Sequence, residues 1–251
     1  MKKAVTSFFM AWGMFFSLPC PYRKWDNALR GAMLLCFPLI GLLIGGIWAL
    51  AAGALDLAGC PSLLRAVLLT ALPFLLTGFI HLDGFMDCCD AILSRRELAE
   101  RRRILKDSRT GSFAVICIVL LMAAEIALFD SADLTGGRRL CLLLLPAVSR
   151  LCSALGIFLL EPMPGSSYAG EFRTCLRPWY APMTGAVLAA AAAATVLLAG
   201  VPAGACGALT AAGALLSVRR GYRQLGGMSG DISGYAITIG ELCGIAALTL
   251  L

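Results

Sequence analysis

The chain has 251 residues, of which 59% are hydrophobic and only 14% charged, and its mean hydropathy is +0.84. Soluble domains carry charge on roughly a quarter of their residues, so this composition excludes an ordinary soluble protein. Several apolar runs reach the ~20 residues that a helix needs to cross a bilayer, and none alternates polar and apolar residues as barrel strands do. We therefore predict an all-α, polytopic integral membrane helix bundle with about six to seven transmembrane helices, in a single membrane-embedded domain over residues 1–251.

The predicted elements begin with residues 1–22, in which two lysines precede an apolar stretch. This segment imitates a signal peptide, but Leu18 and Pro19 stand where a cleavage site needs small residues, so we expect a retained interfacial or re-entrant segment. The spans suggested by hydropathy lie near residues 31–53, 62–82, 112–130, 139–160, 182–200, 203–218 and 234–251. Residues 182–218 are rich in alanine and glycine, which predicts close helix packing.

Lysine and arginine are unevenly distributed, because 17 of the 21 fall in segments 1–30, 83–111, 161–181 and 219–233. Positively charged loops tend to stay in the cytoplasm. We therefore predict a multi-pass protein of the cell membrane with its active-site loops on the cytoplasmic face. The net charge of +6 follows from this topology, so we expect no nucleic-acid partner, and we interpret most of the basic run 95–106 as an anchor to membrane lipid.

The cysteines and the histidine narrow the possible metal chemistry. The eleven cysteines are odd in number and lie mostly inside apolar runs, which indicates small buried side chains rather than disulfides. His81 is the only histidine in the sequence. A metal site with several histidine ligands is therefore excluded.

Carboxylates are concentrated in HLDGFMDCCDAILSRRELAERRRILKDSRTG, residues 81–111. Asp83, Asp87 and Asp90 have helical spacing that places them within ~60° of one helix face. Three like charges beside lipid need a cation or protons to compensate them. Hard oxygen donors favour Mg²⁺, with Mn²⁺ as the other candidate. Asp107 follows just before the next span, and a helical hairpin would return it to the other three.

Basic and glycine-rich residues near these aspartates favour a phosphate-bearing substrate. Lys106 and Arg109 flank Asp107 and would hold phosphate charge. In RQLGGMSGDISG, residues 223–234, glycines allow backbone N–H groups to approach phosphate, and Asp231 could join a metal shell. Arg150 lies within a span, where a charge is costly unless paired, so an ion pair and a substrate contact are equally open. Together these residues indicate phosphoryl-group transfer at the membrane surface.

The same stretches resemble a known family. Residues 81–111 resemble the central signature of the cobalamin synthases, the adenosylcobinamide-GDP ribazoletransferases, and RQLGGMSGDISGYAITIGEL resembles their C-terminal signature. LPCP, FPLIGLLIGG and LPAVSR also resemble family segments and follow the family's order, so the resemblance covers nearly the whole chain.

The resemblance implies a Mg²⁺-dependent transferase of late vitamin B12 assembly. Such an enzyme joins adenosylcobinamide-GDP to α-ribazole or its 5′-phosphate, forms adenosylcobalamin or its phosphate, and releases GMP. It implies that the catalytic and metal-binding residues are Asp83, Asp87, Asp90 and Asp107. Our candidates for substrate binding are His81, Lys106, Arg109, Arg150, Gly227, Gly230 and Asp231.

In the mechanism that this implies, the ribazole 3′-hydroxyl attacks the phosphorus on the corrinoid side and GMP leaves. We expect Asp107 to take the hydroxyl proton. The chain departs from the family pattern at Ala91 and Ala114, where glycine is usual, and at Thr238, where a carboxylate is common, while Glu241 is kept. Thr238 therefore weakens a catalytic role for that position.

Two alternatives remain open at this point. A CDP-alcohol phosphotransferase of phospholipid synthesis also uses spaced aspartates, but its usual motif has two aspartates three apart and a later pair four apart. An ion-coupled transporter would use carboxylates near the bilayer midplane, often at broken helices in repeated halves. Here the aspartates are expected at the end of a span, and no repeat is evident in the sequence.

Overall fold

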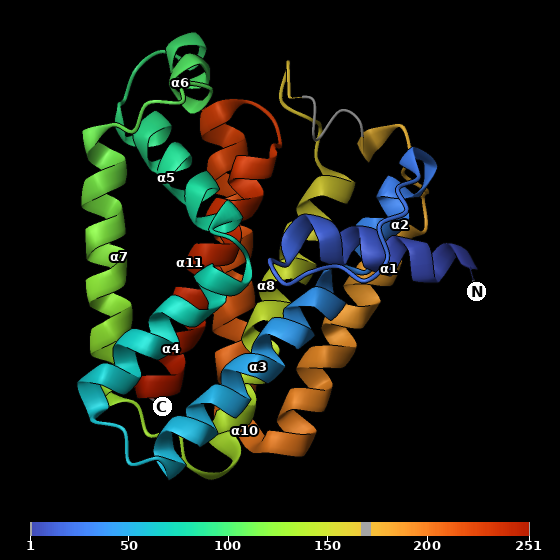
Figure 1. The fold of residues 1–251 in the computed structure, drawn as a ribbon. Coiled ribbons are helices and arrows are strands. Elements are labelled where there is room, and N and C mark those ends of the chain that lie inside the picture. Colours follow the sequence, from blue (N-terminus) through green and yellow to red (C-terminus); the bar gives the residue numbers. More distant parts are fainter. Residues whose placement is uncertain (1, 167–171, 251) are drawn as a thin grey trace.

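The computed structural model describes residues 2–166 and 172–250 as helices joined by mostly short loops (Figure 1). Part of the predicted polar loop 161–181, residues 167–171, lies outside the described residues. Within the described residues, the strand pairing is limited to one isolated bridge between Pro162 and Met228. In chain order the helices are α1 (Lys2–Phe15), η1 (Asn27–Leu29), α2 (Arg30–Leu35), α3 (Phe37–Leu57), α4 (Ser62–Leu76), α5 (Ile80–Leu93), α6 (Leu98–Leu105), α7 (Ser112–Ser131), η2 (Gly136–Arg138), α8 (Arg139–Leu159), α10 (Tyr180–Leu225) and α11 (Gly230–Leu250).

The predicted membrane bundle is confirmed. Among the described residues, five helical segments are long and apolar enough to cross a membrane, and the bent pair α4–α5 makes a sixth if it counts as one span. The five are α3, α7, α8 with η2, the second half of α10, and α11. Large side chains such as Leu57 and Val119 remain exposed on the outside, as expected where lipid replaces water.

The Ala- and Gly-rich region forms two helices, as the sequence indicates, and both carry the single label α10. Gly200 has φ 82° and breaks the helical geometry. The chain then folds back on itself, which brings Gly204 against Val196. A Cβ added to Gly204 would stand only 2.4 Å from the Val196 side chain. The first half contains an apolar helix over Tyr180–Ala193 that is shorter than the predicted span 182–200.

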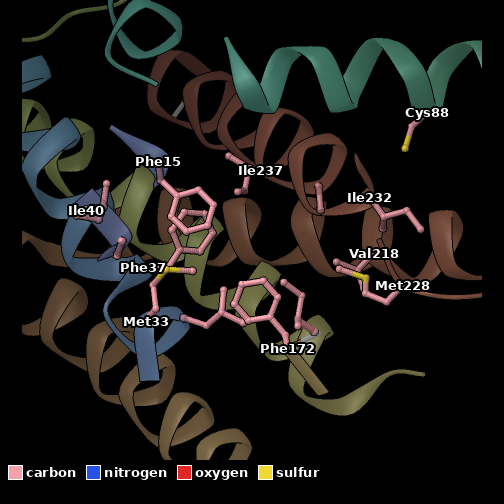
Figure 2. Packing of buried hydrophobic residues seen from close by; sticks show 14 of the residues in the cluster. Phe15, Met33, Phe37, Ile40, Cys88, Phe172, Val218, Met228, Ile232 and Ile237 are labelled. Atoms are coloured by element: carbon pink, nitrogen blue, oxygen red, sulfur yellow. The ribbon is translucent and has the colours of Figure 1, made fainter. Parts of the chain in front are cut away.

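The core forms around α8 and α11, whose side chains are mostly buried. α3 packs closely on α8 because Gly41 and Gly45, four residues apart, present no side chain to it. A Cβ on Gly45 would lie 2.2 Å from the Leu143 carbonyl oxygen. Beside this contact, aromatic and aliphatic side chains from α1, α2, α3, α5, α10 and α11 form one cluster, in which the Phe15 and Phe37 rings lie 4.3 Å apart (Figure 2). All eleven cysteines are free thiols, as predicted.

The basic run forms the short helix α6, which is fastened to the protein. Arg102 Nε donates to the Leu225 carbonyl at 2.8 Å, and Arg101 Nη1 donates to the Gln224 carbonyl at 2.9 Å. These carbonyls belong to the last turn of α10 and lack partners within their own helix. Arg101 and Arg102 therefore cap α10 and are held by the protein, and the lipid anchor stays a prediction for the basic run.

Candidate active site

The helix that carries the aspartates begins after a sharp break in the chain. Gly78 and Phe79 have φ of 59° and 63°, and such left-handed backbone cannot continue a right-handed helix. α5 then starts at Ile80 and is bent by 94° from α4. The predicted continuous span 62–82 is therefore wrong at its C-terminal end. Asp83 lies in the first turn of a new helix rather than at the end of a span.

Two glycines let this helix cross α11 at close range. A Cβ on Gly84 would lie 2.9 Å from the Cα of Asp231, and a Cβ on Gly234 would lie 2.6 Å from the His81 carbonyl oxygen. Any larger residue would push the helices apart. The crossing therefore brings the central and C-terminal sequence motifs together, and it places Asp87 within electrostatic range of the carboxylates of Asp83 and Asp231.

A pocket of about 330 Å³ lies at this crossing. The tip of α6, the segment after α8 and the aromatic side chains of α1 and α3 complete its wall. Five of the eleven predicted site residues line it, namely His81, Asp83, Lys106, Gly230 and Asp231.

The polar groups of the pocket suit an anionic group held beside a cation. Lys106 Nζ donates to the Gly165 carbonyl at 3.1 Å, which holds its charge at the pocket. α11 begins at Gly230, so the positive end of its helix dipole and its first N–H groups also lie there. Ser229 Oγ donates to Asp231 Oδ2 at 3.2 Å and orients that carboxylate. Phosphate charge and a divalent cation would both find partners here.

Asp90 lies apart from this pocket. One of its carboxylate oxygens accepts from the Gly111 N–H at 2.6 Å and the other from the Ala114 N–H at 2.9 Å. These are orphan donors at the N-terminus of α7. The side chain is buried and caps the next helix, so the structure does not bring it to Asp83 and Asp231.

Asp107 is also outside the pocket and is bound to its own neighbours. Arg109 Nη2 lies 2.7 Å from Asp107 Oδ2, and both side chains border a separate hollow with Asp90. The Arg109 hydrogen bonds hold the pKa of Asp107 well below its ordinary value. A carboxylate held in its charged form is a weak base, so this geometry argues against the expected role of Asp107 as the base.

Arg150 forms a buried ion pair. Its Nη1 lies 2.8 Å from Glu241 Oε1, which also accepts from Ser149 Oγ at 2.8 Å. The Arg150 guanidinium stacks over Phe37, 5.6 Å from the ring centroid, and Phe37 in turn contacts His81 and lines the pocket. Of the two roles left open for Arg150, ion pair or substrate contact, the structure therefore shows the ion pair. Phe37 separates Arg150 from the pocket.

Gly227 serves packing rather than the pocket wall. A Cβ on it would stand 2.2 Å from the Cα of Met163. Beside it, Met228 N donates to the Glu161 carbonyl and Met163 N donates to the Met228 carbonyl, both at 2.8 Å. The glycine therefore allows residues 161–163 to pair with the turn before α11, which positions the segment that carries Gly165 at the pocket.

The residues at the pocket fit the predicted cation in type. Mg²⁺ usually takes one or two carboxylates and completes its shell with water and substrate phosphates. Asp83 and Asp231 line the pocket, and Asp87 is close enough to interact with both, so two of these three carboxylates could serve as ligands. Among the described residues, no three His, Cys, Asp or Glu side chains form a closed metal site. A cation bound here would therefore take its remaining ligands from water and substrate.

A family model for cobalamin-5-phosphate synthase matches residues 7–249 of the chain. The chain belongs to this family. The central and C-terminal sequence motifs that resemble this family therefore meet where α5 crosses α11.

Curated relatives named as adenosylcobinamide-GDP ribazoletransferases align with the chain over most of their length. The chain is 32% identical to an adenosylcobinamide-GDP ribazoletransferase of Clostridium botulinum over 256 residues, which cover 100% of this chain and 99% of the relative. It is 36% identical to that of Syntrophobacter fumaroxidans over 215 residues, covering 84% of each. It is 34% identical to that of Shigella boydii over 245 residues, covering 92% of this chain and 94% of the relative. No solved structure matches the chain.

Sequence reasoning missed several pocket residues in this cobalamin-5-phosphate synthase family member. Phe15 and Phe37 form an aromatic wall, and Ser233 lies at the pocket where it pairs with Ser153 of α8. The aromatic residues look like ordinary span residues in the sequence. The serines carry a weak signal, because a hydroxyl inside an apolar run needs a buried partner.

Proposed function

We propose that the chain is an adenosylcobinamide-GDP ribazoletransferase that joins adenosylcobinamide-GDP to α-ribazole or its 5′-phosphate and releases GMP. The observation that carries this proposal is the pocket at the α5–α11 crossing, where two family signatures place two carboxylates, a lysine and a helix N-terminus together. The CDP-alcohol and transporter alternatives are not favoured by the family match. The broken helix at Phe79 is a feature that transporters share, but it does not outweigh that match.

The pocket receives the diphosphate of the activated corrinoid. Its volume of about 330 Å³ is too small for the corrin ring and the guanosine, which therefore extend outside it. Lys106 and the N-terminus of α11 hold the phosphate oxygens. Asp87 and Asp231 would hold Mg²⁺, with Mn²⁺ as the alternative, and the ion would supply positive charge beside the leaving phosphate.

Asp83 replaces Asp107 as our candidate for the base. It is the most exposed of the three carboxylates at the crossing and lines the pocket. Asp83 takes the proton of the ribazole 3′-hydroxyl as that oxygen attacks the phosphorus on the corrinoid side. The bond from this phosphorus to the oxygen of GMP breaks, and GMP leaves.

The decisive experiment uses the purified full-length protein in nanodiscs with adenosylcobinamide-GDP, α-ribazole and Mg²⁺, and follows GMP release together with cobalamin formation. Cys88→Ala is the matched control for Asp83→Asn, because Cys88 lies on the same helix but does not line the pocket. We expect turnover in the wild type and in the control. Absence of GMP and cobalamin with folded protein would overturn the proposal.

The pocket faces the cytoplasm in this proposal, where both polar substrates occur. Support comes from the basic residues of α6 and the end of α10, which lie at the same end of the bundle as the start of α11 (Figure 1). A cysteine-free variant with a single cysteine at exposed position Ser108 should label from the cytoplasmic side. One that keeps only Cys60, in the α3–α4 turn, should label from outside. The reverse pattern contradicts this orientation.

A further inference from the structure

A second pocket lies on the outside of the bundle, where α5, α7 and α11 meet. Its volume is about 300 Å³ and it shares no lining residue with the aspartate pocket. Its wall is apolar, aromatic or thiol-bearing, formed largely by Phe85, Cys89, Cys117, Leu120, Tyr235 and Leu242. Leu120 is 63% exposed, so the pocket opens to the surface that a membrane surrounds. Most of this wall offers no partner to a polar substrate.

The pocket has one charged residue, Arg220, on the neighbouring helix α10. Arg220 is exposed and, within the part of the chain that the structure describes, it forms no ion pair with a carboxylate. It lines the same pocket as Cys89 and Tyr235. An arginine at this position beside lipid needs an anionic partner, because an unpaired charge is costly there.

The depth of these residues matches one leaflet of a bilayer. Arg220 lies five residues before the end of α10, or ~8 Å along the helix, and Tyr235 lies about as far from the start of α11. Leu242 lies ~10 Å deeper than Tyr235 along α11. The charged end therefore lies near the headgroup level, and the apolar part extends through most of the ~15 Å that one leaflet of hydrocarbon occupies.

We propose that this groove is a binding site for a net-anionic phospholipid, with the headgroup phosphate on Arg220 and an acyl chain along α5, α7 and α11. The volume lies at the lower end of the ~300–1,000 Å³ of ligand pockets, which suits a single chain. Phe85 and Tyr235 stack at the groove with ring centroids 6.0 Å apart, and their helices also carry Asp83 and Asp231. The lipid would therefore support the two helices that form the aspartate pocket.

The test is native mass spectrometry of the detergent-purified full-length protein titrated with phosphatidylglycerol or phosphatidylcholine. Arg220→Gln should lower phosphatidylglycerol affinity about tenfold, the effect of one charge-assisted contact. Arg219→Gln is the matched control, since Arg219 is an exposed neighbour on the same helix but does not line the groove. Equal losses in the two variants would indicate non-specific attraction and overturn the site.

A second pair of variants tests the groove itself. Ala124 is exposed and lines it, whereas the adjacent Ala123 is also exposed but does not. Ala124→Trp should fill the groove and weaken phosphatidylglycerol binding, while Ala123→Trp should not. Unchanged binding in Ala124→Trp, or full displacement of the lipid by free glycerol phosphate, would overturn the proposal. Lipid binding is measured without substrates, so its outcome is independent of the proposed transferase activity.

Discussion

Asp90 and Asp83 lie on one helix face by sequence, yet the structure gives them opposite roles. Asp90 accepts from two backbone N–H groups, those of Gly111 and Ala114. Asp90→Asn keeps one side-chain oxygen as an acceptor for one of them and presents an amide NH₂, which cannot accept, to the other. Loss of one charge-assisted bond with a buried N–H left unpaired costs about 2–4 kcal/mol. For a chain of this size that lowers the unfolding midpoint by on the order of 5–10 °C. Turnover by the folded fraction should stay close to that of the wild type.

Asp83→Asn is the matched comparison, because its carboxylate is exposed at the pocket. It should leave the midpoint nearly unchanged but lower kcat by at least ~10²-fold, about 3 kcal/mol of transition-state stabilisation. The assays are GMP release in nanodiscs and thermal unfolding in detergent. If Asp90→Asn kept its midpoint and lost turnover as Asp83→Asn does, Asp90 would be a catalytic ligand, as the sequence alone predicts, and our reasoning about the cap would be wrong.

Three further predictions follow from the same contacts. EDTA should abolish GMP release and Mg²⁺ or Mn²⁺ should restore it, because the pocket offers hard carboxylate donors; full turnover after metal depletion contradicts this. Arg150→Met should destabilise the protein by about 3–5 kcal/mol by leaving Glu241 buried and unpaired, and adding Glu241→Leu should recover much of the unfolding midpoint. Lost turnover at unchanged stability would instead make Arg150 a substrate contact. Gly84→Ala should force α5 away from α11, at a cost of ~1–3 kcal/mol of strain, and lower kcat at least ~10-fold. Gly137→Ala is the control and should match the wild type, because a Cβ on Gly137 would meet no atom within 4 Å.

The sequence by itself determined the class of protein and identified the two motifs that meet at the pocket. Apolar runs of bilayer length can be satisfied only by helices in lipid, so the all-α membrane bundle follows from hydropathy. Asp83 and Lys106 stand out because charges are rare in such a chain. The free cysteines follow from their scatter through apolar runs.

Only the tertiary structure decided which charged residues meet. Helical spacing places Asp90 beside Asp87, but the approach of α7 turns Asp90 into a cap, and a local pattern cannot show the approach of another helix. Asp231 joins Asp83 because two glycines let α5 and α11 touch, and Phe79 bends the chain where hydropathy predicts a continuous span. Hydropathy averages over a window, whereas one left-handed residue redirects a helix. The sequence therefore identified part of the pocket, namely five of its lining residues, and backbone geometry at a few positions set how they assemble.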